Sequence, residues 1–196
     1  MRKRDENKEF LVRQKALEML VGIGFDGFSM QKLAKEVGVS PATLYIYYKD
    51  KEDLIIQLGI EEGQKMMAAS LHNFDPQMNF EAGLRLQWEN RSHFWINNPL
   101  STKYFEQIKH SPYADRVVTR VSLEFKEIMQ EFVHNAQQHQ ELINISIEAF
   151  WTIAFAPLYS LIYFHQTGKS VGNRPFSLNK KVIDEVFSLV IKALKP

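Results

Sequence analysis

Residues 28–54, FSMQKLAKEVGVSPATLYIYYKDKEDL, contain two short helical patterns separated by a tight turn. In the first pattern, Ser29 is a natural N-cap, and Leu33 and Val37 fall on one face of a helix. Gly38 ends this helix, because glycine readily takes the left-handed conformation that follows a helix C-terminus. A helix, a glycine-containing turn and a second helix together predict a helix-turn-helix.

The second helix of this motif begins at Ser40, which is its N-cap, and Pro41 occupies its first position, where a missing N–H costs nothing. We expect Leu44 and Tyr48 to face back toward the first helix. Four other side chains then point away from the first helix: Ala42, Thr43, Ile46 and Tyr47.

The major groove of B-DNA is about 12 Å wide and admits one α-helix. Short side chains at the N-terminal end of the second helix allow its backbone to approach the bases closely. Thr43 can bond a base edge or a phosphate, while Tyr45 and Tyr47 offer hydroxyls to phosphates, and Lys49 and Lys51 follow at the start of the next helix. With Gln31 added from the first helix, the predicted DNA-binding residues are Gln31, Ser40, Pro41, Ala42, Thr43, Tyr45, Tyr47, Lys49 and Lys51.

A glycine turn between helices is also compatible with a small helical hairpin inside a bundle, with its tyrosines buried. However, residues 34–54, AKEVGVSPATLYIYYKDKEDL, resemble the DNA-binding signature of the TetR/AcrR family of bacterial transcriptional regulators. The resemblance implies DNA binding. It has two departures: Ile46 is apolar where a base-contacting or aromatic residue is common, and Tyr48 stands where phenylalanine is common. The matching positions are Ala34, Gly38-Val39-Ser40, Thr43-Leu44-Tyr45, Tyr47-Tyr48, Lys49, Lys51 and Leu54.

Composition argues against several other classes of protein. The chain has 196 residues and no cysteine, so it has no disulfide framework and no thiol nucleophile. H-E-x-x-H and glycine-rich phosphate loops are absent from the sequence, and its six histidines include no i, i+4 pair. We therefore expect a protein that is not an enzyme, with no metal site and no cofactor.

The ends and the charge of the chain indicate where it acts. No apolar run approaches the ~20 residues that span a bilayer, and the N-terminus lacks the apolar segment of a signal peptide, which predicts a cytoplasmic protein. Residues 1–51 carry ten Lys and Arg against seven Asp and Glu, a modest excess of three. The basic tail Arg2-Lys3-Arg4 is interpreted either as a solvated terminus or as a segment near a phosphate or in the minor groove.

Apolar periodicity predicts an all-α fold of about nine helices, and the family resemblance implies the same number in a 3 + 6 arrangement. Residues 1–53 are predicted to form a three-helix DNA-binding domain, and residues 54–196 a C-terminal helical bundle for ligand sensing and dimerisation. Helix 50–71 would be the lever between them, with Gly59 and Gly63 marking a bend or close packing. Beyond the motif, helices are predicted over 5–23, 50–71, 78–98, 100–110, 113–138, 142–166 and 180–194. In the first of these, the predicted buried stripe is Phe10, Leu11, Ala16, Leu17, Leu20 and Val21.

Helices 142–166 and 180–194 are too apolar for burial on one side only. A two-fold seam with a second copy would cover them, and two recognition helices about 34–36 Å apart would read a near-palindrome. The family is commonly dimeric through its last two helices, so a homodimer is expected, although packing inside one chain is the alternative. The predicted interface residues are Ile147, Trp151, Leu158, Ile162, Val182, Val186 and Val190.

Large rings recur around the predicted bundle and are interpreted either as core or as the lining of a cavity for an apolar or aromatic effector. TetR-like proteins typically bind an effector there and release DNA. The predicted pocket residues are Trp88, Phe94, Trp95, Phe105, Phe125, Phe150, Trp151, Phe155 and Tyr159. Polar specificity would come from some of Arg85, Glu89, Asn90, Arg91 and His93, whose directions the sequence does not show.

The expected function is therefore that of a sequence-specific DNA-binding regulator, with repression and release by an unidentified small effector as the family's usual behaviour. Its expected partners are double-stranded DNA, a second copy of the chain and that effector. Two alternatives stay open: a helix-turn-helix that docks protein instead of DNA, and a regulator without a small ligand.

Overall fold

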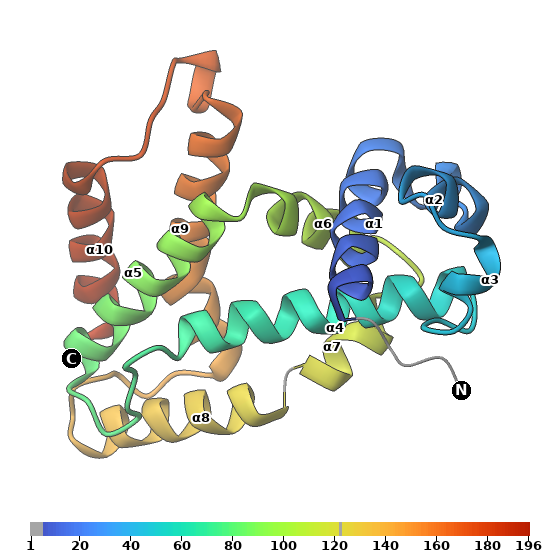
Figure 1. The fold of residues 1–196 in the computed structure, drawn as a ribbon. Helices are drawn as coiled ribbons and strands as arrows, with labels where there is room; N and C mark the ends of the chain where they lie inside the picture. The colour runs from blue at the N-terminus through green and yellow to red at the C-terminus, as the bar shows by residue number, and fades with distance from the viewer. Residues whose placement is uncertain (1–5, 122) are drawn as a thin grey trace. The chain divides into compact units, whose positions relative to one another are not determined.

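A computed structural model describes residues 6–121 and 123–196, so the basic tail at residues 2–4 lies outside the described residues (Figure 1). The described chain is all-α, as predicted, with ten α-helices, one 3₁₀ helix and a single isolated β-bridge between Lys169 and Pro175. The α-helices are α1 (Glu6–Gly27), α2 (Met30–Glu36), α3 (Pro41–Leu44), α4 (Lys51–Ser70), α5 (Phe80–Asn97), α6 (Pro99–Lys109), α7 (Ala114–Val121), α8 (Leu123–Gln138), α9 (Ile147–Thr167) and α10 (Lys180–Leu194), and the 3₁₀ helix is η1 (Val171–Asn173).

Three predicted helices differ from the observed ones. The helix predicted to end at residue 23 continues to Gly27 as α1, with a kink at Gly24, whose φ is +70°. The helix predicted over 113–138 is two helices, α7 and α8. The helix predicted from residue 142 begins at Ile147, because the Ser146 side chain caps it by accepting a hydrogen bond from the Ala149 N–H. Ahead of that cap the chain is not helical, and the Ile143 N–H donates to the Leu194 carbonyl oxygen at the end of α10.

The chain divides into two compact units. The first contains the described residues up to Lys65 together with Asn98–Val121, and the second contains Met66–Asn97 together with Leu123–Pro196. The chain passes from the first unit into the second within α4, and α6 and α7 pack with the N-terminal helices. The functional division at residue 53 stays a prediction.

The core of the first unit contains Val12, Ala16 and Leu20 of α1. The apolar buried face of α1 therefore begins at Val12, one residue after the predicted Leu11. Phe10 and Leu11 are exposed, which corrects their predicted burial. Val12, Ala16 and Leu20 repeat every four residues, so the same face one turn earlier passes near position 8 or 9, and Glu9 is buried there.

Two glycines of α4 allow a close approach of α7. A Cβ on Gly59 would lie 2.7 Å from a Val117 methyl carbon, and one on Gly63 would lie 2.7 Å from a Val121 methyl carbon. Of the two interpretations of these glycines, close packing is therefore the one that the structure supports. Nearby, the buried Tyr104 hydroxyl donates to the Ile55 carbonyl oxygen at 2.6 Å, and burial raises the pKa of Tyr104.

The second unit is built on α5, whose Trp88 is buried and donates from Nε1 to the Ala154 carbonyl oxygen of α9 at 2.7 Å. The Trp88 ring meets Phe187 of α10 edge-on, with centroids 5.2 Å apart. Phe80 of α5 stacks on Phe132 of α8. Aromatic side chains from α5, α8 and α10 therefore pack together in this core.

We expect Gly59→Ala to lower the free energy of unfolding by about 1–2 kcal/mol. The added methyl group meets the buried, β-branched Val117, and overpacking of this kind costs more than the roughly 1 kcal/mol that alanine gains over glycine in a helix. Chemical denaturation of both proteins measures the difference.

Gly22→Ala is the matched control, because nothing lies within 4 Å of a Cβ at Gly22 in α1, and it should be neutral or stabilising. Adding Val117→Ala to Gly59→Ala removes the clash, so the two changes should couple. Equal effects of Gly59→Ala and Gly22→Ala would contradict close packing of α4 on α7.

Candidate nucleic-acid interface

The turn between α2 and α3 is fixed by backbone hydrogen bonds. The Gly38 N–H donates to the Lys35 carbonyl oxygen and the Val39 N–H donates to the Ala34 carbonyl oxygen at 2.9 Å, with Gly38 at φ +68°. This is the Schellman arrangement, in which a left-handed residue after the helix satisfies its last carbonyl groups. At the other end of α2, the Ser29 side chain accepts from the Lys32 N–H, as the sequence predicts.

Helix α3 has four residues, so it cannot be stable on its own and depends on its contacts. Ser40 caps it by accepting from the Thr43 N–H, and Pro41 occupies its first turn. Leu44 and Tyr48 are buried in the core of the first unit, as predicted. The Tyr48 hydroxyl has no hydrogen bond of normal geometry; burial raises the pKa of Tyr48, and the nearby Arg13 guanidinium opposes that rise.

Burial of Leu44 and Tyr48 turns the opposite side of α3 outward. Ser40, Pro41, Ala42 and Tyr45 are exposed there, and Thr43 and Tyr47 are half-buried. The other predicted contacts flank this side: Gln31 is exposed on α2, Lys49 is exposed ahead of α4, and Lys51 is half-buried at the start of α4. Ile46, which carries no polar group, is also exposed.

The polar atoms at the tip of α3 form a small internal network. The Ser40 Oγ and Thr43 Oγ1 atoms are 2.9 Å apart, and the Ser40 Oγ also receives the Thr43 N–H. Because a hydroxyl has one donor and two acceptor positions, Thr43 keeps hydrogen-bonding capacity for an outside group after this contact.

The start of α4 is less favourable for a phosphate than the sequence suggests. The Asp50 carboxylate accepts from the Asp53 N–H at 2.8 Å, and the Asp53 carboxylate accepts from the Lys49 N–H at 2.9 Å. These carboxylates occupy backbone donors that a phosphate would use, and they place negative charge there. Contacts at this point would therefore come from the Lys49 and Lys51 side chains.

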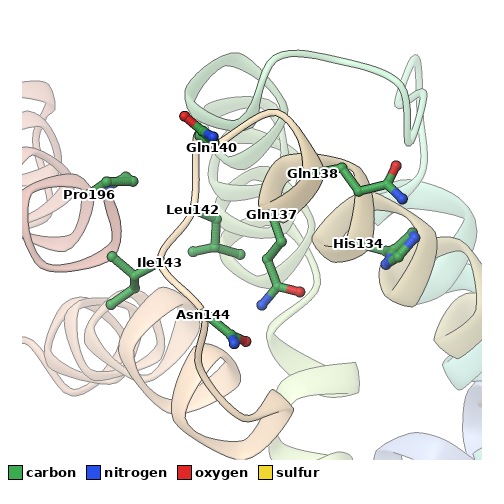
Figure 2. A pocket seen from close by; sticks show the side chains of 8 residues that line it. All are labelled: His134, Gln137, Gln138, Gln140, Leu142, Ile143, Asn144 and Pro196. Atoms are coloured by element: carbon green, nitrogen blue, oxygen red, sulfur yellow. The ribbon is translucent and has the colours of Figure 1, made fainter.

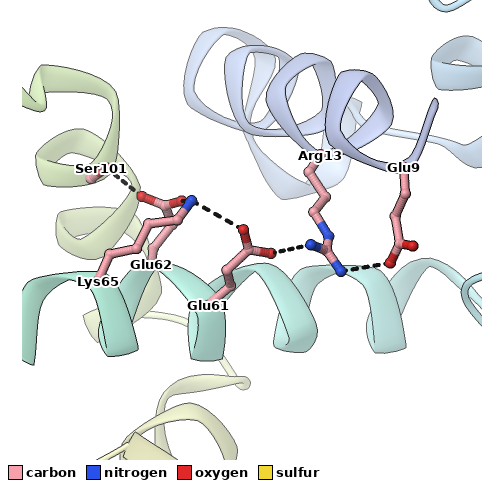
Figure 3. A network of polar contacts seen from close by, with 6 residues as sticks. All are labelled: Glu9, Arg13, Glu61, Glu62, Lys65 and Ser101. Atoms are coloured by element: carbon pink, nitrogen blue, oxygen red, sulfur yellow. Dashed lines mark hydrogen bonds and ion pairs between the residues drawn. The ribbon is translucent and has the colours of Figure 1, made fainter. Parts of the chain in front are cut away.

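A polar network ties α4 to α1 and α6 within the first unit (Figure 3). Arg13 of α1 pairs with Glu9 at 2.6 Å and with Glu61 of α4 at 3.0 Å. Lys65 pairs with both Glu61 and the buried Glu62, and Ser101 of α6 donates to Glu62. Charge-assisted contacts of this kind are worth most where they are shielded from water, so they position α4 against α1 and α6.

The predicted pocket residues do not all come together. Phe105 belongs to α6 of the first unit, whereas the other eight residues belong to the second unit. Several of the eight pack on one another: the Trp151 and Phe155 centroids are 4.7 Å apart, and Phe125 meets Trp151 edge-on at 6.2 Å. Among the five polar candidates, only Arg91 is buried.

One open hollow of about 660 Å³ lies in the second unit; four of its eight lining residues have side-chain amides, and none is among the predicted aromatic residues (Figure 2). A hollow of about 470 Å³ in the first unit is lined mostly by charged residues of α4, of α7 and of the segment just ahead of α4, which includes Lys49. The lining residues of the first hollow are His134, Gln137, Gln138, Gln140, Leu142, Ile143, Asn144 and Pro196.

The predicted interface residues divide into two groups. Leu158, Ile162 and Val190 are buried within the chain, whereas Ile147 and Trp151 are exposed; Val182 and Val186 are half-buried. Two exposed residues that the sequence did not single out, Tyr163 of α9 and Leu189 of α10, extend the apolar surface. Spacing alone could not separate them from core residues, because apolar side chains occur on several sides of both helices.

Helix α9 is the one described helix that is long and apolar enough to cross a membrane by composition, in contrast to the sequence-based expectation. Only 33% of its most apolar stretch is buried within the chain. A core helix of a soluble protein also meets this criterion, so composition alone does not make α9 a membrane span.

Comparisons with known proteins agree with the helix-turn-helix. A family model described as "Bacterial regulatory proteins, tetR family" matches residues 13–58. An uncharacterized HTH-type transcriptional regulator of Haemophilus influenzae is 27% identical over 146 residues, which cover 70% of this chain and 72% of that protein. The fatty acid metabolism regulator protein of Bacillus subtilis is 40% identical over 43 residues, 22% of each chain.

Solved structures extend the likeness to the whole chain. A TetR family transcription regulator from Marinobacter aquaeolei is 26% identical with a TM-score of 0.79, covering 99% of this chain and 98% of that one. A TetR-family regulator from Haemophilus influenzae shares the fold at 20% identity and a TM-score of 0.79, with both chains covered completely.

The motif, the all-α fold and these relatives define a helix-turn-helix regulator of transcription. The chain belongs to the TetR family of bacterial transcriptional regulators, which bind DNA.

We expect Thr43→Ala and Tyr47→Ala each to weaken binding to the operator by about 5- to 150-fold, because a lost base or phosphate contact of this kind costs about 1–3 kcal/mol. Fluorescence anisotropy with labelled operator measures the change. Thr167→Ala is the matched control, since its hydroxyl bonds only to carbonyl groups near the end of α9, and it should leave affinity unchanged. Wild-type affinity in both α3 variants would contradict the assignment of α3 as the reading helix.

Proposed function

We propose that the chain is a cytoplasmic homodimeric repressor that binds a near-palindromic operator through α3 and is released from it by a small apolar or aromatic effector. The predicted DNA-binding residues keep their proposed roles, with Thr43 at a base edge or phosphate and Tyr45 and Tyr47 at flanking phosphates. Ile46 would touch at most a thymine methyl group.

The observation that carries this proposal is the outward-facing end of α3. Its first residues are Pro41, Ala42 and Thr43, all small, and the Leu44 and Tyr48 side chains anchor the opposite side in the core. A helix that presents its N-terminal end on a fixed base is what insertion into a major groove requires.

A second copy of the chain would cover the exposed apolar surface of α9 and α10. The exposed positions Thr152, Ala156, Ser160 and Tyr163 lie along one face of α9 and carry no charge, and Leu189 is exposed on α10. An uncharged helix face of this length, largely unburied in the single chain, supports a two-fold helical seam. The contacting residues would be the exposed ones, because Leu158, Ile162 and Val190 already pack inside the chain.

Effector control would act through α4, which is held to α1 and α6 in the first unit and continues into the second. A ligand that prefers the conformation with low DNA affinity shifts the population by its difference in affinity for the two states. A complete switch, from 1:99 to 99:1, needs about 5.5 kcal/mol of that difference.

Docking of a protein on the helix-turn-helix is the alternative, and salt dependence separates it from DNA binding. We expect selection from a random duplex pool to recover a near-palindromic site. The logarithm of its binding constant should fall with log[salt] at a slope of about −0.9 per phosphate contact. No enrichment by a folded, dimeric protein would contradict operator recognition and favour protein docking.

We expect the double variant Tyr163→Glu/Leu189→Glu to be monomeric at concentrations where the wild-type chain is dimeric, because four carboxylates would be buried at the seam of each dimer. Analytical ultracentrifugation measures the mass. Val171→Glu is the control: Val171 is exposed between α9 and α10, and the change adds one negative charge per chain outside the proposed face. A monomeric wild-type chain, or a double variant that stays dimeric, would contradict this seam.

A further inference from the structure

Arg91 of α5 is buried in the second unit, with 1% of its surface exposed, and no carboxylate in the described chain pairs with it. Its Nε donates to the buried Gln87 Oε1 at 3.1 Å, and its Nη1 donates to the Tyr159 hydroxyl oxygen at 2.6 Å. Both partners are neutral. No neighbouring carboxylate of the described chain therefore balances the charge of this buried guanidinium.

The remaining terminal nitrogen, Nη2, is buried and has no hydrogen-bond partner among the described residues. Burying a charged donor without a partner is costly, and such groups are normally paired with an opposite charge. Arg85, on the same helix, shows the ordinary solution: its Nη1 lies 2.6 Å from an Asp184 carboxylate oxygen. Arg91 lacks the anion that Arg85 has.

Aromatic rings stabilise the unpaired cation in part. The guanidinium carbon lies 4.4 Å from the Phe155 centroid, 5.2 Å from that of Phe125 and 5.4 Å from that of Trp151. Cation–π contacts favour a desolvated guanidinium, but they supply no acceptor for the Nη2 hydrogens. The three rings thus form an apolar wall beside an unsatisfied donor.

The same groups are suitably placed to recognise an anion attached to an apolar body. Gln87 and Tyr159 hold the guanidinium in one orientation through Nε and Nη1, and Nη2 is left without an acceptor. Because Tyr159 accepts from Arg91, its own proton is available to donate to the same anion. Among the three rings, Trp151 is 37% exposed whereas Phe125 and Phe155 are buried, so Trp151 is the ring a ligand would displace.

We infer that Arg91 binds the carboxylate of the effector, which therefore is an aromatic or aliphatic acid. This inference rests on the proposed sensing function. The carboxylate accepts hydrogen bonds from Nη2 and from the Tyr159 hydroxyl, and the apolar body takes the place of the Trp151 ring beside Phe125 and Phe155. A carboxylate has two oxygens, one for Nη2 and one for the Tyr159 hydroxyl, and its hydrogen bond to the guanidinium is charge-assisted.

Two pairs of probes test the inference on the full-length protein: 2-naphthoate with 2-naphthamide, and decanoate with decanamide. Each pair differs in charge at nearly constant shape. We expect the wild-type chain to bind at least one acid tenfold or more tightly than its amide, as tryptophan fluorescence and release of labelled operator both measure. In Arg91→Met the preference should disappear, since methionine keeps much of the volume and removes the charge.

Arg85→Met is the matched control, because it removes an arginine from the same helix and should keep the preference for the acid. Tyr159→Phe should reduce that preference without abolishing it. Equal binding of acid and amide by the wild-type chain would overturn the role of Arg91 while leaving effector sensing intact, and this comparison needs no variant. Persistence of the preference in Arg91→Met would overturn it too, whereas binding of no probe by the wild-type chain would contradict the sensing function itself.

Discussion

The left-handed turn at Gly38 is the constraint on which the DNA-binding part depends. Its two backbone hydrogen bonds end α2 and direct the chain into Ser40, which caps α3. Because α3 has only four residues, its direction is set by this turn on one side and by the buried Leu44 and Tyr48 on the other. The exposure of Pro41 and Ala42 and the partial exposure of Thr43 follow from these contacts. Of the side chains proposed to meet DNA, Ser40 also helps to hold α3 in place, because it is the N-cap of that helix.

The second unit is held together by an aromatic core that also contains a buried arginine. Its aromatic side chains are well packed, and Trp88 has the hydrogen bond that a buried indole requires. Arg91 is different, because this buried cation has three aromatic neighbours and two neutral hydrogen-bond partners but no anion beside it. Polar groups of this kind are rarely left unsatisfied where stability alone is at stake. Because the Arg91 guanidinium has no anion to pair with inside the chain, we expect a bound ligand to supply one.

Much of the fold could be predicted from the sequence, because the caps Ser29 and Ser40 and the turn at Gly38 act locally. The start of α9 was predicted too early because apolar residues continue ahead of Ser146. The hydrogen bond from the Ala149 N–H to the Ser146 hydroxyl marks where the helix begins. Three features depend on tertiary packing and could not be predicted. They are the choice of rings that form the core, the apolar residues of α9 and α10 that are exposed, and the one of five polar residues that is buried. Arg91 was one of those five, but its unpaired nitrogen has no signature in the sequence.

The central claim, that two copies of α3 read one operator, is tested most directly by hydroxyl-radical footprinting of the selected site. The account predicts two protected patches related by two-fold symmetry, on one face of the duplex, with centres one helical turn of about 34–36 Å or a multiple of it apart. Alanine at Thr43 should weaken both patches equally. A single asymmetric patch, or protection that ignores sequence, would contradict the account.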